Sequence, residues 1–257
     1  RYYSGSKGEI GYVKLDTSST GNLSNQWMTK YFKDYGNAYF WVQDVDYDND
    51  SELAYALTWG GYVSRWSIFR APLSSFNQTS GHSTFIDNIH EKIEEDLGYI
   101  GDIKDMKVGK SYVFLTLSVS GNISKIVKIN KGNGEFSYIS SPDKPYSIEL
   151  VSDDEFFLSS KENGQIYHYK NEEFIPLGSE IQGYYDGKLT SGRFNSPYYL
   201  TLSPSGDLYF IDEVVTDDEN YSNYHIRKLS FLKDADEDGV YDEYDNCVYT
   251  SNSDQKD

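Results

Sequence analysis

Residues 146–177 read YSIELVSDDEFFLSSKENGQIYHYKNEEFIPL, and no other stretch says more about the fold. It contains four short runs rich in apolar and aromatic residues, at 146–151, 155–160, 165–170 and 173–177. The residues between the runs include Asp, Asn and Gly, which favour tight turns. Short strands joined by tight turns predict an antiparallel four-stranded sheet.

The same rhythm recurs along the chain. Related runs that follow a turn begin at residues 9, 62, 123, 165 and 225. A period of roughly 40–60 residues built from short strands is typical of β-propeller blades. We therefore expect further strands near 39–45, 53–59 and 62–69, near 103–108, 111–119, 123–129 and 135–139, and near 197–203, 207–212 and 224–231. Residues 1–35 fit the outer half of another blade. The sequence thus predicts an all-β propeller of about five blades. Closure of the ring can require residues that precede Arg1.

Residues 88–98 break the strand rhythm. Asn88 is a good N-cap, Glu91 follows three residues later, and Gly98 can end a helix. The segment therefore predicts a short helix inserted between two blades. Such an insertion is either a lid over a binding site or a tolerated excursion at the rim, and the sequence leaves both open.

The composition excludes several classes of partner. The 257 residues include 41 acidic and 23 basic side chains, and the net charge is −18. Nucleic acids and anionic membrane surfaces bind through basic surfaces, so we expect neither as a partner. No stretch approaches the roughly 18 consecutive apolar residues of a membrane span, so we expect no membrane insertion. A single cysteine, Cys247, excludes a disulfide within the chain.

The acidic residues are concentrated at the C-terminal end. Residues 233–257 hold nine acids and two bases, a net charge of −7. This shift in composition predicts a boundary between a propeller at 1–232 and a second module at 233–257.

The spacing of the acids in the second module is that of a calcium-binding loop. Oxygen-bearing groups stand at positions 1, 3, 5, 7, 9 and 12 of a loop with Gly239 at position 6: Asp234, Asp236, Asp238, the Val240 carbonyl, Asp242 and Asp245. Ca²⁺ takes about 6–8 oxygen ligands, and the glycine allows the sharp turn that such a loop needs. Because carboxylates packed this closely repel one another without a cation, the spacing predicts bound Ca²⁺ rather than a solvated acidic tail.

The residues that follow this loop resemble the thrombospondin type 3 repeat. The matching residues are Asp245-Asn-Cys247 and Asn252-Ser-Asp254-Gln255-Lys-Asp257, with Val248 and Ser253 in place of the prolines usual in the family. The resemblance implies a tandem array of extracellular calcium-binding repeats, in which Asp257 is the first ligand of the next loop. It also implies that Cys247 pairs with a cysteine of a following repeat, and a free thiol is the alternative.

A second acidic segment, Asp44-Val-Asp46-Tyr-Asp48-Asn49-Asp50-Ser-Glu52, is predicted to be a loop that joins two strands. Its oxygen-bearing side chains at positions 1, 3, 5 and 9 are Asp44, Asp46, Asp48 and Glu52, and Asn49 can adopt a left-handed turn. The segment resembles the calcium loop of FG-GAP blades in integrin-type propellers, without the glycine. A calcium site and an ordinary acidic hairpin turn both stay open, and Asp50-Ser51 offers another register.

Residues 192–212, GRFNSPYYLTLSPSGDLYFID, together with Ile226-Arg227-Lys228, resemble an NHL repeat. The resemblance implies one propeller blade and supports the predicted fold. It does not imply one function, because propellers host many unrelated functions.

The sequence offers few candidates for catalysis. Its four histidines are His82, His90, His168 and His225, and the last two fall in predicted outer strands rather than beside a central channel. The motifs HExxH and GxSxG are absent from the sequence. We therefore predict that the protein is not an enzyme, and a lyase or hydrolase of the NHL type is the weakest of three alternatives.

Aromatic residues are the candidate ligand contacts. Trp27, Trp41, Trp59 and Trp66, with 25 tyrosines, either pack the blades or form a surface that stacks on sugars or proteins. We expect an extracellular, secreted or cell-surface module whose propeller binds a glycan or protein ligand in adhesion. The calcium array would be a stiff connector to further repeats of the same protein. The alternative is a structural or assembly module without a small ligand.

Overall fold

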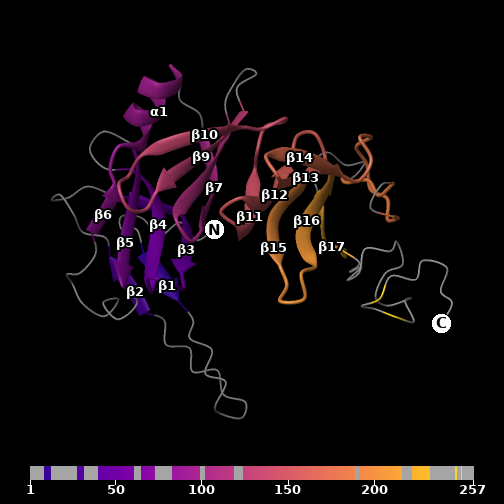
Figure 1. Cartoon of the computed structure of the whole chain (residues 1–257), viewed down its shortest axis with the longest axis horizontal. Helices are drawn as coiled ribbons and strands as arrows, with labels where there is room; N and C mark the ends of the chain where they lie inside the picture. The colour runs from indigo at the N-terminus through magenta and orange to yellow at the C-terminus, as the bar shows by residue number, and fades with distance from the viewer. Residues whose placement is uncertain are drawn as a thin grey trace, which may run out of the picture.

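The protein is described by a computed structural model, in which one short helix accompanies an otherwise all-β arrangement (Figure 1). The structure describes residues 9–12, 28–31, 40–60, 65–72, 83–98, 102–118, 124–188, 191–215 and 222–231, and the single residues 247 and 250. Within these ranges the strands form four blade-like sheets and one two-stranded sheet, all antiparallel. This is a four-bladed β-propeller arrangement.

Three blades have four strands each, in chain order from the inner strand outward. Blade 1 contains β3 (Phe40–Asp48), β4 (Leu53–Gly60), β5 (Arg65–Pro72) and β6 (Ser83–Ile86). Blade 2 contains β7 (Asp102–Val108), β8 (Tyr112–Ser118), β9 (Ser124–Asn130) and β10 (Phe136–Ser140). Blade 3 contains β11 (Ser147–Ser152), β12 (Glu155–Ser160), β13 (Gln165–Lys170) and β14 (Glu173–Leu177). The strands predicted for blades 2 and 3 are confirmed, and blade 1 has a fourth strand, β6, that the sequence did not reveal.

Blade 4 has three strands in the described ranges, β15 (Pro197–Leu202), β16 (Leu208–Val215) and β17 (Ser222–Leu229), as predicted. β1 (Glu9–Tyr12) and β2 (Met28–Tyr31) form the two-stranded sheet. The predicted fifth blade is not confirmed: the described residues make four blades, and within these residues β1 and β2 pair with each other. The predicted module at 233–257 lies outside the described residues apart from positions 247 and 250.

The predicted helix is confirmed as α1 (Ile89–Leu97), between blades 1 and 2. Gly98 ends it in a left-handed conformation with its N–H bonded to the Glu94 carbonyl, whereas Asn88 makes no side-chain cap. Ile89 and Ile93 bury the apolar face of α1 in the core of these blades, so α1 is fastened to the propeller. The described part of the chain has no helix with the length and apolar character needed to cross a membrane.

Each pair of neighbouring blades encloses its own hydrophobic core. Leu115 lies in the core between blades 1 and 2, whereas the adjacent Phe114 lies in the core between blades 2 and 3. Phe156 and Phe157 divide in the same way between the two cores on either side of blade 3. Successive side chains of a strand point to opposite faces, so a strand between two blades needs apolar residues at consecutive positions. This is why the second strand of each blade contains an unbroken run of apolar residues.

The inner strands of neighbouring blades are joined by side-chain oxygens rather than by backbone pairing. At the first junction, the Met106 N–H of β7 donates to Asp44 Oδ2 of β3 (2.8 Å). Two residues further along, the Val108 N–H donates to Asp46 Oδ2 (2.6 Å). An unpaired buried N–H costs free energy, so these carboxylates replace the missing backbone partner where the strands diverge.

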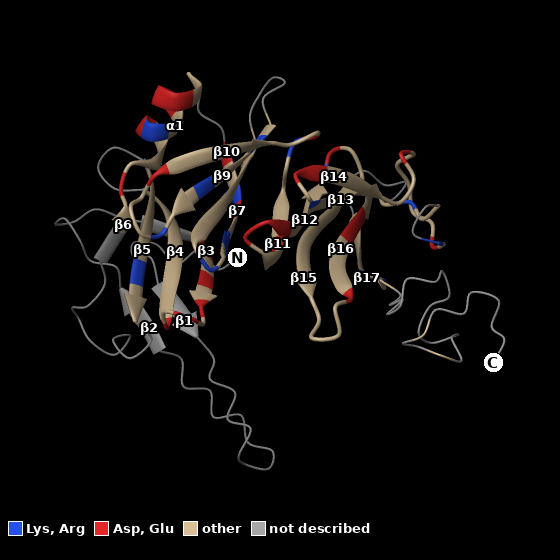
Figure 2. Ribbon diagram, in the orientation of Figure 1, with Lys and Arg blue, Asp and Glu red and all other residues tan. Residues whose placement is uncertain are grey.

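The same relation recurs at the next two junctions. The Ile148 N–H of β11 donates to Asp105 Oδ2 of β7 (2.8 Å). The Leu202 N–H of β15 donates to Glu149 Oε1 of β11 (3.0 Å). We call Asp44, Asp46, Asp105 and Glu149 the inner-strand carboxylates. Acidic residues are present in every blade (Figure 2), and these four are part of the framework.

A buried ion pair fastens the connection that leads into blade 4. Asp212 of β16 is fully buried and accepts the N–H groups of Asn195 (2.9 Å) and Ser196 (2.8 Å). Arg227 of β17 donates to Asp212 Oδ2 (2.7 Å) and to the Tyr185 carbonyl (3.0 Å). Both charged residues belong to the segments that resemble an NHL repeat, and here they hold the β14–β15 connection against the blade.

We predict that Arg227→Met destabilises the protein by about 3–5 kcal/mol, because it leaves the buried Asp212 carboxylate without its counter-ion. The matched control is Lys228→Met, next along the same strand. Lys228 is half exposed and lies 3.5 Å from Asp207, so its loss should change stability by less than about 0.5 kcal/mol. Denaturant unfolding of the two variants measures the difference, and equal midpoints would contradict this role of Arg227.

Candidate functional site

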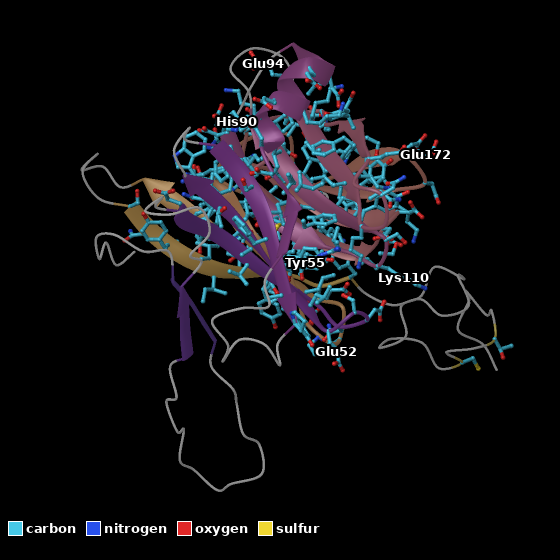
Figure 3. The ribbon with its side chains drawn as sticks, turned by 90° about the vertical axis from the view of Figure 1, so that its left-hand side faces the viewer. Glu52, Tyr55, His90, Glu94, Lys110 and Glu172 are labelled. Atoms are coloured by element: carbon cyan, nitrogen blue, oxygen red, sulfur yellow. The ribbon has the colours of Figure 1, made fainter. Side chains whose placement is uncertain are left out.

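The acidic segment at 44–52 is mostly strand and not the predicted loop. β3 continues to Asp48, so Asp44, Asp46 and Asp48 alternate along it and lie on one face. The turn itself occupies residues 49–52, with the exposed Glu52 at the far end of the sheet from α1 (Figure 3). The strand continues this far because its carboxylates bind the neighbouring strand β7, a partner that the local sequence does not reveal.

Asp48 has a different partner from the two inner-strand carboxylates that precede it. Its Oδ2 lies 2.6 Å from Lys131 Nζ, which also donates to the Gly109 carbonyl (2.7 Å). Ser51 Oγ donates to the same carboxylate. Burial opposes ionisation of Asp48, but the hydrogen bonds from Lys131 and Ser51 outweigh burial, and the pKa of Asp48 is lowered. Asp48 is therefore a charged anchor between the turns of blades 1 and 2.

The residues predicted to bind calcium are placed by the structure only in part. The described ranges contain no group of three or more His, Cys, Asp or Glu side chains arranged to hold a metal. Calcium binding by Asp44, Asp46, Asp48 and Glu52 stays a prediction. The predicted ligands of the C-terminal loops lie outside the described residues: Asp234, Asp236, Asp238, Val240, Asp242, Asp245 and Asp257.

Asp105 is the most perturbed carboxyl group among the inner-strand carboxylates. Ser147 Oγ and the Ile148 N–H both donate to its Oδ2, at 2.6 and 2.8 Å. Burial, reinforced by a hydrogen bond and by repulsion from Asp44, raises the pKa of Asp105 to about 8. Asp105 is thus protonated at neutral pH and donates to Asp44, which lets two carboxyl groups share one junction. Burial also raises the pKa of Asp46, against the hydrogen bond from Val108.

A cluster of tyrosines lies where β15 and β17 begin and β16 ends. We call it the tyrosine surface, and its members are Tyr146, Tyr198, Tyr199, Tyr224, Lys161 and Glu213. Tyr146 precedes β11 and Lys161 follows β12, whereas the others lie on the strands of blade 4. In antiparallel sheets the start of one strand lies beside the end of its neighbour, so blades 3 and 4 bring these distant residues together.

The rings of the tyrosine surface support one another. The ring centroid of Tyr198 lies 5.8 Å from that of Tyr146, 4.8 Å from that of Tyr199 and 6.4 Å from that of Tyr224. Tyr198 is buried, whereas Tyr199 is 55% exposed and Tyr224 is 61% exposed. Two exposed rings are therefore held in place by a buried third, as in a preformed contact surface.

The backbone at Tyr199 is unusual. Its φ is +52°, in the left-handed region, and the register between β15 and β16 shifts between Tyr198 and Thr201. A left-handed conformation costs a residue with a Cβ roughly 1–2 kcal/mol. Such conformations and bulges are enriched where a side chain must be aimed at a functional site. The bulge is what lets the adjacent residues Tyr198 and Tyr199 differ in exposure while both belong to the cluster.

A charged pair lies among the rings. Lys161 Nζ is 2.5 Å from Glu213 Oε2, and it lies over the rings of Tyr198 and Tyr146, 4.7 and 5.7 Å from their centroids. Tyr224 Oη donates to Glu213 Oε1 (3.4 Å). Hydrogen bonding to Lys161 lowers the pKa of Glu213, while burial, followed by the charge of Glu213, raises the pKa of Tyr198 to about 12. Glu213 therefore stays ionised, and the Tyr198 hydroxyl stays neutral, across the physiological pH range.

The sequence alone does not distinguish these tyrosines from the others. The tyrosine content was the one available signal, and it applies equally to all 25 tyrosines. Lys161 and Glu213 gave no signal, because nothing in the sequence links the β12–β13 turn to the end of β16. The site exists only once two blades pack side by side.

The described histidines and tryptophans pack within the blades. His168 of β13 bonds Glu155 through Nε2 (2.8 Å) and stacks on Phe157, in a third strand as predicted. His225 of β17, also in a third strand, lies against Tyr184. The ring of His90, from α1, contacts the rings of Trp59 and Trp66 of blade 1, which also contact each other. His82 and Trp27, and the side chain of Trp41, lie outside the part of the chain that is described.

No protein-family model and no curated protein matches the chain. Among solved structures it is similar to a structural genomics protein of unknown function from Bacteroides thetaiotaomicron. That match has 16% identity and a TM-score of 0.53, and it covers 74% of this chain and 45% of the other. A protein of unknown function from Bacteroides caccae matches at 11% identity and a TM-score of 0.47, over 70% of this chain and 59% of the other. Virginiamycin B lyase from Staphylococcus aureus matches at 13% identity and a TM-score of 0.43, over 81% and 61%. The chain thus spans about half the length of the first two proteins, and the first likeness bears on the fold alone.

We predict that Asp105→Asn flattens the dependence of stability on pH. Asp105 has an ordinary pKa near 4 when unfolded and a raised pKa near 8 when folded, so the folded state binds the extra proton. Stability should then fall as pH rises from about 4 through about 8. Asparagine can still accept from the Ile148 N–H and donate to Asp44, but its side chain does not titrate. The stability of the variant should therefore not fall over this pH range. Unfolding at a series of pH values tests it, with the exposed Asp102→Asn as control. An unchanged pH profile for Asp105→Asn would contradict the shared proton.

Proposed function

We propose that this protein is a calcium-binding extracellular adhesion module that holds its ligand on the tyrosine surface. The observation that carries the proposal is the pair of exposed rings, Tyr199 and Tyr224, which both contact the buried ring of Tyr198 beside Lys161. Large exposed aromatic residues backed by buried ones are typical of recognition surfaces. Rigid tyrosines also lose little conformational entropy when a ligand covers them.

The calcium part of the proposal rests on the sequence between residues 234 and 257. The loop from Asp234 to Asp245 has the spacing of calcium ligands, and its resemblance to thrombospondin type 3 repeats implies an extracellular array. In this proposal calcium stiffens a connector between the propeller and further repeats of the same protein. The acidic composition favours such a role, because the loops need cations to fold.

Binding without catalysis is the role that we propose for the propeller. His168 and His225, two of the histidines considered as channel ligands, are engaged with Glu155 and Tyr184 in outer strands. The inner-strand carboxylates serve as acceptors for backbone N–H groups. These contacts support a structural role for the two histidines and the inner-strand carboxylates. A hydrolase or lyase would need such groups free to contact its substrate.

An assembly module is the second candidate function, and one observation favours it. Ile226 of β17 is 81% exposed and lies two residues from Tyr224 along the same strand. An isoleucine this exposed beside aromatic rings suits a contact between protein surfaces. Sedimentation of the purified chain with and without Ile226→Lys separates the two functions: a concentration-dependent oligomer that the substitution abolishes supports assembly.

We predict that Tyr199→Ala and Tyr224→Ala each weaken binding of the labelled chain to its target surface by about tenfold, because each removes one exposed ring. The target surface is sought in a panel of intact cells and extracellular-matrix coatings. Tyr185→Ala is the matched control, since Tyr185 is 59% exposed but lies in the β14–β15 connection. Equal binding by all three variants would contradict the assignment of the tyrosine surface.

We predict that removing calcium unfolds residues 233–257 and leaves the blades intact. A site with a dissociation constant of about 10⁻⁴ M in about 1 mM calcium gains about 1.4 kcal/mol, so several sites should act together. Hydrogen exchange with and without a chelator measures this directly. Faster exchange in 233–257 with unchanged exchange in β8 and β12 is expected, and equal exchange in both states would refute the calcium module.

A further inference from the structure

We propose that the ligand of the tyrosine surface is an uncharged glycan. Its sugar rings stack on Tyr199 and Tyr224, and its hydroxyl groups bond the Lys161–Glu213 pair. This inference rests on the proposed function and names the chemical class of the ligand.

The exposed rings suit the apolar face of a sugar. A pyranose presents C–H groups on one face and hydroxyl groups at its edge, so it needs a flat aromatic support with polar groups beside it. Tyr199 and Tyr224 supply two such supports, and both contact the buried ring of Tyr198. The two supports are joined through one buried ring, so a ligand of more than one sugar residue can engage both.

The charged pair supplies hydrogen bonds in both directions. A carboxylate has about four acceptor sites and an ammonium group has three donors. Glu213 accepts hydrogen bonds from Lys161, Ser222 and Tyr224, which leaves about one acceptor site, and Lys161 uses one donor for Glu213. Capacity therefore remains on both groups for hydroxyls, which donate and accept. Because the pair is held by protein contacts, it is oriented before a ligand arrives.

The charge balance argues against a polyanionic ligand. Sulfated or uronic glycans need cations that are not already neutralised. The cations at this end of blade 3 are Lys161, paired with Glu213, and Lys144, paired with Glu162 at 2.7 Å. The net charge of −18 adds long-range repulsion for any anion. An uncharged ligand avoids both penalties.

A cationic ligand is disfavoured for a different reason. Aromatic rings attract ammonium groups, and Lys161 Nζ already lies over Tyr198 and Tyr146. A ligand cation would have to displace a lysine that is also bonded to Glu213. The rings that remain exposed are thus suited to stacking rather than to caging a charge.

The experiment is a glycan array probed with the calcium-loaded chain, followed by calorimetry on the best ligand. The array carries neutral oligosaccharides of glucose, galactose, mannose and N-acetylhexosamines, together with sulfated and sialylated ones. We expect binding to neutral glycans, reduced about tenfold or more by Tyr199→Ala or Tyr224→Ala and unchanged by Tyr185→Ala. Thermal unfolding of each variant confirms that it is folded. Binding confined to sulfated or sialylated glycans would overturn the inference, and so would neutral-glycan binding that all three variants retain.

A second measurement separates this inference from the proposed function. Target cells are treated with glycosidases before the labelled chain is added. If no glycan on the array binds, and binding to treated cells persists but is lost in Tyr199→Ala, the ligand is a protein: the glycan assignment fails and the proposed function stands. If Tyr199→Ala and Tyr224→Ala bind like the unaltered chain in both assays, both proposals fail.

Discussion

The hydrogen bond from a backbone N–H of one inner strand to a side-chain carboxylate of the preceding one is the interaction on which the propeller depends. Neighbouring blades diverge too far for their inner strands to pair, so the edge of each strand would otherwise lie unsatisfied at the centre of the molecule. A carboxylate reaches across this gap and accepts more than one donor, as Asp105 does for Ser147 and Ile148. The hydrophobic cores hold the blades face to face, and the carboxylate oxygens determine the register of each inner strand relative to the next.

Alternating carboxylates of this kind serve the framework of the propeller, and the same spacing is found in calcium sites. Oxygens at alternate positions suit a divalent cation, and they suit equally a row of N–H groups on a neighbouring strand. In β3, Asp44 and Asp46 accept the N–H groups of Met106 and Val108, and calcium binding by these residues stays a prediction. The cost is electrostatic: Asp44 and Asp105 come so close that one of them must keep its proton, which links stability to pH.

The tyrosine surface depends on the same junctions. Glu149 places β15 along β11, and that placement brings Tyr198 and Tyr199 of blade 4 against Tyr146 and Lys161 of blade 3. A surface built across a junction responds to any change in how the blades meet. The exposed rings are thus presented by a rigid support, which suits recognition of a ligand with little rearrangement.

The blades follow from the amino-acid sequence alone, because strand rhythm and turn residues are local and each strand of blades 2 and 3 carries its own pattern. It also located α1 and the third-strand positions of His168 and His225. The partners of the polar side chains between blades become visible only in the folded protein. Asp44 and Asp46 meet Met106 and Val108, and Lys161 meets Glu213, across distances in sequence that no local pattern encodes. The number of blades also becomes visible only in the folded protein. Every blade has the same strand pattern, and this pattern does not show which blade is the first or the last. Local chemistry fixes what each strand is, and the packing of one sheet on another fixes what its polar side chains do.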